Sequence, residues 1–362
     1  MVDYKNPKLI IDTTELEPGE VTWKSPSNLA LIKYWGKYGM QLPKNPSVSF
    51  TLNNAYSSTK IAYKAKETGD QDISLDFYFH DEPNEAFRNR VKKYLNNLVD
   101  IFPFLRQMHL TVHSQNSFPH SAGIASSASG LSAIALCLCS IEDRLFGTLE
   151  EDDAFDRKTS FVARLGSGSA CRSIFPKMAI WGEMGEVQGS SDYYVIPFGD
   201  ELHESFQGFH DDILIVSSGE KSVSSSAGHE LMNENPYADP RYGQARQRMH
   251  HLLMSLRNGD LETFGRITEN EALTLHALMM ASNPSYILMQ PNSLEIIAKI
   301  RAFRADTGHP VYFSLDAGPN VHVLYPDSII YEVRPFVESE LLPLCQDQQW
   351  LPDWVGDGPE EL

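Results

Sequence analysis

Residues 119–136 read PHSAGIASSASGLSAIAL, a loop rich in Gly and Ser that leads into an apolar segment. Small residues let a backbone approach a ligand closely, and a helix that begins near Ser129 would turn its free N–H groups and positive dipole end toward a phosphate. The hydroxyls of Ser126 and Ser127 would add contacts to phosphate oxygens or to Mg²⁺. A Ser-rich helix cap explains the same residues equally well, so the loop alone leaves phosphate binding open.

The segments around this loop predict an α+β fold with mixed sheets. Before the loop, short stretches have the composition or alternation of strands, and the single apolar face of residues 85–102 predicts a helix. After the loop, the apolar periodicity predicts more helices with two short strands among them. The expected strands are 61–63, 75–79, 109–113, 311–315 and 321–325, and the later helices are 241–257, 261–280, 294–304 and 328–342.

The length and charge of the chain limit its class. Its 362 residues suit two domains or one large cleft-bearing unit. A polar, Gly-rich segment over 185–207 places the boundary near its end, with a first lobe over 1–205 and a second over 206–362. The net charge is −18, and so acidic a surface argues against nucleic acid and anionic membranes as partners. An anionic small molecule would need a local basic site.

The N-terminus and the cysteines are typical of a cytoplasmic protein. The chain does not begin with a basic stretch followed by an apolar one, and its longest apolar run, near 131–141, is far shorter than the roughly 20 residues of a membrane span. The four cysteines have neither C-x-x-C nor zinc-site spacing, which favours buried free thiols in a reducing compartment. We therefore expect a cytoplasmic location.

Residues 25–37 (SPSNLALIKYWGK) bring basic side chains together in this acidic chain. Lys33 and Lys37 lie here with Tyr34 between them, and Lys44 follows. The block is the basic site that an anionic substrate would need, unless it is only a solvated charged face.

Two further blocks carry side chains suited to a reaction site. Residues 163–173 (ARLGSGSACRS) place Arg172 among glycines and serines. Arg suits bidentate binding of a carboxylate or phosphate, and a surface salt bridge is the alternative. Residues 312–320 (YFSLDAGPN) place Asp316 at the end of an apolar strand. A carboxylate there is either a turn residue or a general base that faces a cleft.

The four blocks, in this order, resemble the diphosphomevalonate decarboxylase family, of the superfamily of galactokinase, homoserine kinase, mevalonate kinase and phosphomevalonate kinase. N-L-A-L-I-K-Y-W-G-K, G-S-G-S-A-C-R-S and D-A-G-P-N are typical of the decarboxylases, and the Gly/Ser-rich loop is typical of the superfamily. The resemblance implies a two-lobed α+β fold with a deep central cleft, and a homodimer. It also implies an enzyme that uses ATP and Mg²⁺ to convert mevalonate 5-diphosphate into isopentenyl diphosphate, CO₂, ADP and phosphate.

The resemblance also implies a role for each site residue. Asp316 would orient or deprotonate the 3-hydroxyl, Arg172 would hold the carboxylate, and Lys221 would assist phosphoryl transfer. The implied substrate contacts are Asn28, Tyr34, Lys37, Ser167, Ser169 and Ser225. The implied contacts to the ATP phosphates are Gly123, Ser126 and Ser127, with Mg²⁺ carried by those phosphates and Ser127 as its candidate ligand.

The chain departs from the family pattern over residues 219–229 (GEKSVSSSAGH). The family usually has Ser-Arg and then Gly-Met here, whereas this chain has Ser226 in place of the Arg and His229 in place of the Met. A related 3-hydroxyl kinase, or a decarboxylase of mevalonate or its 5-phosphate, is therefore an alternative, although Asp316 and Arg172 together favour decarboxylation of the diphosphate. Their presence also argues against a non-catalytic ATP-binding protein. A protonated His229 would add a donor, so we expect the substrate KM to rise between about pH 6 and 8.

Overall fold

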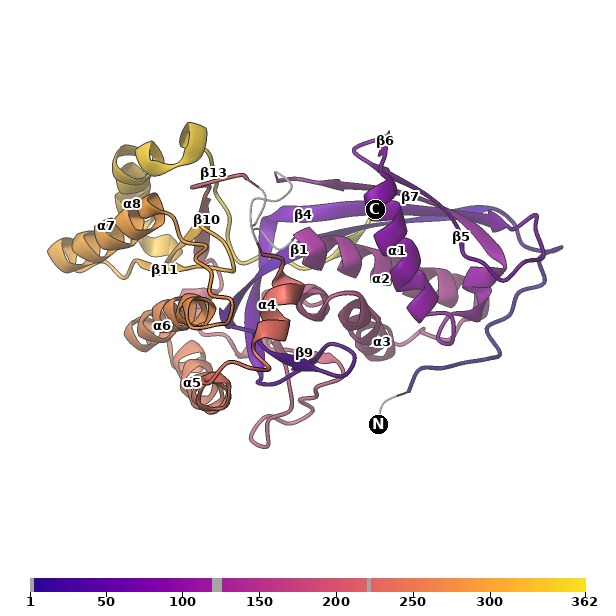
Figure 1. Ribbon diagram of the computed structural model, residues 1–362, viewed down its shortest axis with the longest axis horizontal. Coiled ribbons are helices and arrows are strands. Elements are labelled where there is room, and N and C mark those ends of the chain that lie inside the picture. Colours follow the sequence, from indigo (N-terminus) through magenta and orange to yellow (C-terminus); the bar gives the residue numbers. More distant parts are fainter. Residues whose placement is uncertain (1–2, 119–125, 220–222) are drawn as a thin grey trace.

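The computed structural model describes residues 3–118, 126–219 and 223–362. Figure 1 shows two sheets side by side, with α1, α2 and α3 over the larger sheet and α5 to α8 around the smaller one. The strands are β1 (Gly19–Ile32), β2 (Lys37–Tyr38), β3 (Leu42–Pro43), β4 (Ser47–Ala65), β5 (Ser74–Phe79), β6 (Glu82–Pro83), β7 (Met108–Asn116), β8 (Met178–Trp181), β9 (Val195–Pro197), β10 (His210–Leu214), β11 (Tyr312–Ser314), β12 (Val321–Tyr325), β13 (Trp350–Leu351) and β14 (Glu360–Glu361). The helices are α1 (Glu85–Asn97), α2 (Ser126–Phe146), α3 (Asp152–Gly166), α4 (Ser225–Leu231), α5 (Ala238–Asn258), α6 (Leu261–Met280), α7 (Pro291–Thr307) and α8 (Ile330–Phe336).

Both sheets place strands from distant parts of the chain next to one another. In the described residues the larger sheet has eight strands in the order β14-β1-β4-β7-β5-β6, with β8 paired to β4 and β9 paired to β8. The smaller sheet has the order β11-β12-β10-β13. Most neighbours are antiparallel, but β5 and β7 are parallel. The predicted α+β class with mixed sheets is therefore confirmed.

The first strand, β1, carries the N-L-A-L-I-K-Y-W-G-K block toward the centre of the molecule. Its residues from Ser25 to Ile32 are all buried, and it pairs with β4 along most of its length. The register shifts between Pro26 and Asn28 and again between Ala30 and Ile32. Such bulges bend a strand and re-aim its side chains, and they tolerate the missing N–H of a proline.

Helix α2 packs against β1 and β4 through small side chains. Ser129 Oγ lies 2.7 Å from Ser57 Oγ, and Ser132 Oγ lies 2.5 Å from Ser25 Oγ. The helix begins at Ser126, so the predicted start near Ser129 is three residues too late. Because the helix and the sheet pack closely, the first turn of α2 lies beside strand β1 and its N-L-A-L-I-K-Y-W-G-K block.

The predicted helix over 328–342 is interrupted. Helix α8 contains Pro335, which cannot donate a backbone hydrogen bond, and the chain continues as a π-helical turn (Val337–Leu341) and a 3₁₀ turn (Leu342–Leu344).

The C-terminal strand β14 returns to the larger sheet, where it pairs with β1. The boundary between residues 205 and 206 stays a prediction. The four cysteines are free and buried, as expected. No helix within the described ranges is long and apolar enough to cross a membrane.

Candidate active site

A cleft of about 640 Å³ gathers residues from both halves of the chain. Ten of the twelve predicted site residues line it, and the other two, Lys221 and Gly123, lie outside the described residues. The ten are Asn28, Tyr34, Lys37, Ser126, Ser127, Ser167, Ser169, Arg172, Ser225 and Asp316. Blocks that are far apart in the sequence therefore meet at one surface, as the resemblance implies.

The cleft is basic although the whole chain is acidic. Among the described residues that line it, four are basic (Lys33, Lys37, Arg90 and Arg172) and only Asp316 is acidic. This is the local basic site that the net charge of −18 would require for an anionic ligand. Lys44 is not among these lining residues, and its ammonium lies over the Tyr38 ring, 5.3 Å from the ring centroid.

An ion pair between Lys33 and Asp316 joins the two halves of the cleft. Lys33 follows the end of β1, and its Nζ donates to Asp316 Oδ1 at 2.9 Å and to Ser314 Oγ at 3.1 Å. The Lys33 side chain is only 2% exposed. A buried ammonium is strongly unfavourable unless it is paired, so the carboxylate and ammonium hold each other in place.

Arg172 is held rigidly by the sheet beneath it. It lies in the 3₁₀ helix Gly168–Ser173, where its Nε donates to Ser49 Oγ (2.5 Å) and its Nη1 donates to Ser47 Oγ (2.9 Å). The guanidinium carbon lies 5.8 Å from the centre of the Trp181 ring. Burial lowers the pKa of Arg172, and the nearby Asp316 charge opposes this shift. Because Ser47 and Ser49 alternate along β4, both point to the same face of the sheet.

Asn28 offers a side-chain acceptor that the described part of the chain leaves unpaired. Its Nδ2 donates to the Ser169 carbonyl oxygen (3.1 Å) and to Ser173 Oγ (2.8 Å). Its Oδ1 is buried and has no hydrogen-bond partner among the described residues. A buried acceptor without a donor is unfavourable, so this site suits a ligand that carries a hydroxyl.

Tyr34 lies in a tightly packed corner of the cleft. Its ring centroid is 4.7 Å from that of Trp181 and 4.4 Å from that of His229. A Cβ on Gly168 would lie 2.6 Å from the Tyr34 ring, so this position of the G-S-G-S-A-C-R-S block requires glycine. Beside it, Lys37 donates from Nζ to Gln41 Oε1 (3.0 Å), and burial lowers its pKa.

His229 corrects one expectation from the sequence. It is buried, and its Nδ1 accepts a hydrogen bond from the Gly36 N–H at 3.0 Å. Burial first, and then the charges of Lys37 and Arg172, lower the pKa of His229 to about 3. The imidazole is therefore neutral between pH 6 and 8, and the predicted rise in KM from its deprotonation is wrong.

We expect acidification to destabilise the wild type more than the His229→Met variant. The pKa of His229 is about 3 in the fold and about 6.5 in the unfolded chain, so below pH 6.5 the unfolded chain binds the proton first. The contribution to stability is therefore complete above pH 6.5 and decreases as the pH falls. Urea unfolding at pH 7, 6 and 5 measures this, and parallel curves for the two proteins would contradict it.

The other end of the cleft combines hydroxyls, a guanidinium and an apolar pocket. Ser126 and Ser127 begin α2, and Arg90 of α1 donates from Nη2 to Ser127 Oγ at 3.1 Å. Burial lowers the pKa of Arg90. An adjoining pocket of about 70 Å³ shares Arg90, Ser126 and Ser127 with the cleft. Its other walls include Phe77, Phe79, Phe87, Val91, Leu131 and Ile134.

This donor set fits phosphate oxygens. No group of three or more His, Cys, Asp or Glu side chains in the described parts of the chain is arranged to hold a metal ion. Mg²⁺ commonly binds through one or two protein oxygens together with the phosphates of a substrate, so Ser126 and Ser127 suit an ion that phosphates carry.

Four residues of the candidate site were not predicted from the sequence. Lys33 was recognised only as part of a basic block, although a charge within the apolar run N-L-A-L-I-K-Y-W was a signal of burial. Arg90 lies in a helix outside every motif, and Ser47 and Ser49 lie in a strand with no distinctive pattern. Only their neighbours in the folded chain show that Arg90, Ser47 and Ser49 belong to the candidate site.

Comparisons with known proteins agree with the geometry. Residues 25–193 match a family model described as the diphosphomevalonate decarboxylase-like N-terminal domain, and residues 212–351 match the mevalonate 5-diphosphate decarboxylase C-terminal domain. The diphosphomevalonate decarboxylase of Ganoderma lucidum is 30% identical over 331 residues, which cover 87% of this chain and 80% of that protein.

Solved structures of such enzymes are also similar over almost the whole chain. The mevalonate diphosphate decarboxylase of Staphylococcus aureus has a TM-score of 0.81 and 25% identity, covering 97% of this chain and 99% of that one. A structure of MDDEF in complex with MVAPP, AMPPCP and magnesium has a TM-score of 0.79 and 29% identity, covering 96% and 99%. The resemblance found in the sequence is confirmed, and the chain belongs to the diphosphomevalonate decarboxylase family.

Proposed function

We propose that this chain catalyses the ATP-dependent decarboxylation of mevalonate 5-diphosphate to isopentenyl diphosphate, CO₂, ADP and phosphate. The observation that carries the proposal is one basic cleft in which the Lys33–Asp316 ion pair and the buried Arg172 lie together. Family membership supports it, as does the similar MDDEF complex with MVAPP, AMPPCP and magnesium.

Asp316 acts on the 3-hydroxyl of the substrate. A tertiary hydroxyl is a poor leaving group, so it first attacks the γ-phosphate of ATP and becomes a phosphate ester. Asp316 accepts the hydrogen bond of this hydroxyl, orients it and takes its proton, and the Lys33 ammonium at 2.9 Å balances the carboxylate charge. Lys221 as an aid to phosphoryl transfer stays a prediction from the family resemblance.

Arg172 holds the carboxylate that is lost as CO₂. When the phosphate leaves C3, the electron pair of the bond to the carboxylate moves to form the new double bond, and CO₂ departs. A guanidinium fixed by Ser47 and Ser49 keeps the carboxylate aligned for this step without reorganising. Asn28 and the hydroxyls of Ser167 and Ser169 complete this part of the substrate site.

The substrate diphosphate and ATP occupy opposite ends of the cleft. Tyr34, Lys37 and Ser225 contact the diphosphate. Arg90, Ser126 and Ser127 contact the ATP phosphates, with Gly123 as a further predicted contact. When bound, Mg²⁺ neutralises phosphate charge, and Ser127 is its candidate ligand from this chain. A homodimer and a cytoplasmic location stay predictions.

The substrate is tested by following ADP and CO₂ release with mevalonate, its 5-phosphate and its 5-diphosphate. We expect the 5-diphosphate to have the highest kcat/KM and to release ADP and CO₂ in equal amounts. ADP without CO₂ would identify a 3-hydroxyl kinase instead. A higher kcat/KM with the 5-phosphate would replace the diphosphate assignment with the related decarboxylase.

Restoring the family Arg should strengthen diphosphate binding. Ser226 lines the cleft where the family usually has an Arg. A charged hydrogen bond to phosphate contributes roughly 1.5–3 kcal/mol, so Ser226→Arg should lower the diphosphate KM by about 10-fold or more, and the monophosphate KM by less. Ser226→Gln adds similar bulk without charge and is the matched control. Equal effects of Arg and Gln would contradict the role of charge.

A further inference from the structure

The backbone of Lys33 is held by side chains rather than by the sheet. Strand β1 ends at Ile32, where its last pairing with β4 occurs. A buried N–H and C=O beyond the strand still need partners. The Lys33 N–H donates to Glu271 Oε2 of α6 at 3.0 Å, and its carbonyl oxygen accepts from Asn45 Nδ2 at 3.2 Å and from Arg241 Nη2 at 3.4 Å.

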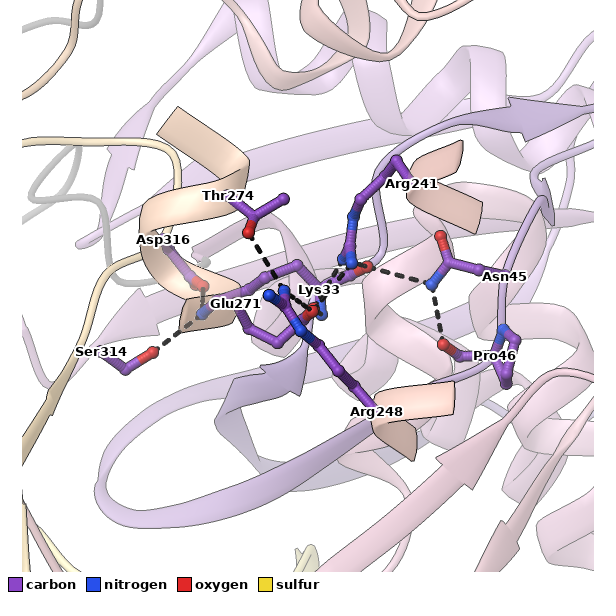
Figure 2. Close-up of polar contacts among 9 residues, drawn as sticks. All are labelled: Lys33, Asn45, Pro46, Arg241, Arg248, Glu271, Thr274, Ser314 and Asp316. Atoms are coloured by element: carbon purple, nitrogen blue, oxygen red, sulfur yellow. Dashed lines mark hydrogen bonds and ion pairs between the residues drawn. The ribbon is translucent and has the colours of Figure 1, made fainter. Parts of the chain in front are cut away.

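Glu271 is itself fixed by two arginines of α5. Arg241 binds it with both terminal nitrogens, at 2.8 Å to Oε1 and 2.6 Å to Oε2. Arg248 Nη1 donates to Oε1 at 2.7 Å and to Thr274 Oγ1 at 3.0 Å. Burial would raise the pKa of Glu271, but the Arg241 charge and the hydrogen bonds from Arg241 and Arg248 outweigh it and leave the pKa below its usual value. Figure 2 shows how these side chains converge on Lys33.

The same helix also holds the backbone of Asp316. Its residue His276 lies five positions after Glu271, roughly 7.5 Å along the helix axis. Because a carbonyl oxygen can only accept, His276 Nε2–H donates to the Asp316 carbonyl oxygen, at 3.1 Å. Helix α6 therefore contacts the main chain of both residues whose side chains form the 2.9 Å ion pair in the cleft.

We propose that Glu271 and His276 are positioning residues that fix the Lys33 and Asp316 main chains from one helix and so set the geometry of their ion pair. This inference rests on the proposed function for the catalytic meaning of the pair. Glu271 accepts a hydrogen bond from the main-chain N–H of Lys33, so its effect on the reaction passes through the position of Lys33. Small displacements of reacting groups can cost about 100-fold in rate, which is the scale of the expected effect.

The first test is Glu271→Gln, with Glu269→Gln as the matched control. Glu269 is also buried on α6 and also pairs with both terminal nitrogens of an arginine, Arg304, at 2.6 and 3.2 Å. Both variants should lose thermal stability. Only Glu271→Gln should lower kcat by about 10- to 100-fold, with KM for both substrates changed less than about threefold. A folded Glu271→Gln protein with near-wild-type kcat, or an equal loss in Glu269→Gln, would overturn the proposal.

A second readout does not depend on activity and so separates this inference from the proposed function. Hydrogen–deuterium exchange of the Lys33 amide should become faster in Glu271→Gln and stay slow in Glu269→Gln. Unchanged protection in both would overturn the proposed contact even if the reaction were another one. If exchange changes but no variant affects turnover, the pair is held as described but does not limit the reaction, and the positioning role is rejected.

If Glu271→Gln does not fold, His276 decides the question. His276→Phe fills a similar volume but cannot donate to the Asp316 carbonyl oxygen, whereas His276→Gln retains a donor. We expect kcat to fall by about 10-fold or more in His276→Phe and by clearly less in His276→Gln, with little change in either KM. Equal kcat values in both variants would overturn the role of the hydrogen bond.

Discussion

Asp316→Asn should abolish turnover while ATP and substrate still bind within about tenfold of the wild type. Asparagine keeps the size of the side chain but cannot take the proton of the 3-hydroxyl. The loss of a general base typically costs 10²–10⁴-fold, and more where the carboxylate also orients the hydroxyl. The Lys33 ammonium, 2.9 Å away and 2% exposed, would also lose its charge partner, so the thermal midpoint should fall. Steady-state kinetics measures the loss of turnover, and calorimetric titration of each ligand measures the retained binding.

A surface pair provides the control for Asp316→Asn. Glu340 accepts a hydrogen bond from Lys299 at 2.7 Å on the surface, so Glu340→Gln also removes the carboxylate partner of a lysine. This variant should keep full activity. Turnover of Asp316→Asn above about a tenth of the wild-type rate would reject Asp316 as the base.

Arg172→Lys should reduce kcat/KM by about 10²- to 10⁴-fold although the positive charge is retained. A lysine cannot donate to Ser47 and Ser49 and at the same time bind a carboxylate with two parallel hydrogen bonds. Losing two charged hydrogen bonds of roughly 1.5–3 kcal/mol each gives this range. The rate of CO₂ release with saturating ATP measures it.

The neighbouring Arg164 is the matched control for Arg172. It is also buried, but it binds the carbonyl oxygens of Tyr193 and Met40 and is not among the described residues that line the cleft. Arg164→Lys should therefore cost stability and leave CO₂ release within a few-fold of the wild type. Similar losses in both variants would show that Arg172 acts through packing rather than by holding the carboxylate.

Short motifs were enough to locate most of the candidate site, because their chemistry depends on local spacing. Gly168 and Arg172 lie four residues apart in one block. Asp316 lies just after β11, so its position follows directly from the end of that strand. Helix α6 was predicted over 261–280 and is found as Leu261–Met280, since a long amphipathic periodicity is a strong signal. The helix over 328–342 was less predictable because Pro335 interrupts it.

Contacts between distant residues explain what the motifs left out. Arg90 and Ser127 are 37 positions apart, in different helices, and no local pattern links them. His229 was expected to titrate near neutral pH, but burial and the charges of Lys37 and Arg172 keep it neutral. Burial depends on which elements pack together, so the pKa of a free histidine does not predict the pKa of His229 in the fold.

The sequence alone therefore predicted the α+β class from its periodicity and the family from its motifs, and the comparisons confirm both. It also singled out Asp316 and Arg172 as candidates, since each lies in a short motif of fixed local spacing. The folded chain established that Lys33 is buried against Asp316, 283 positions away, and that Glu271 and His276 of α6 contact the main chain of both. In the sequence Lys33 is one of three neighbouring lysines. It becomes distinct because β1 ends in an interior where an ammonium is stable only beside a carboxylate, and the chain after β11 places the Asp316 carboxylate there.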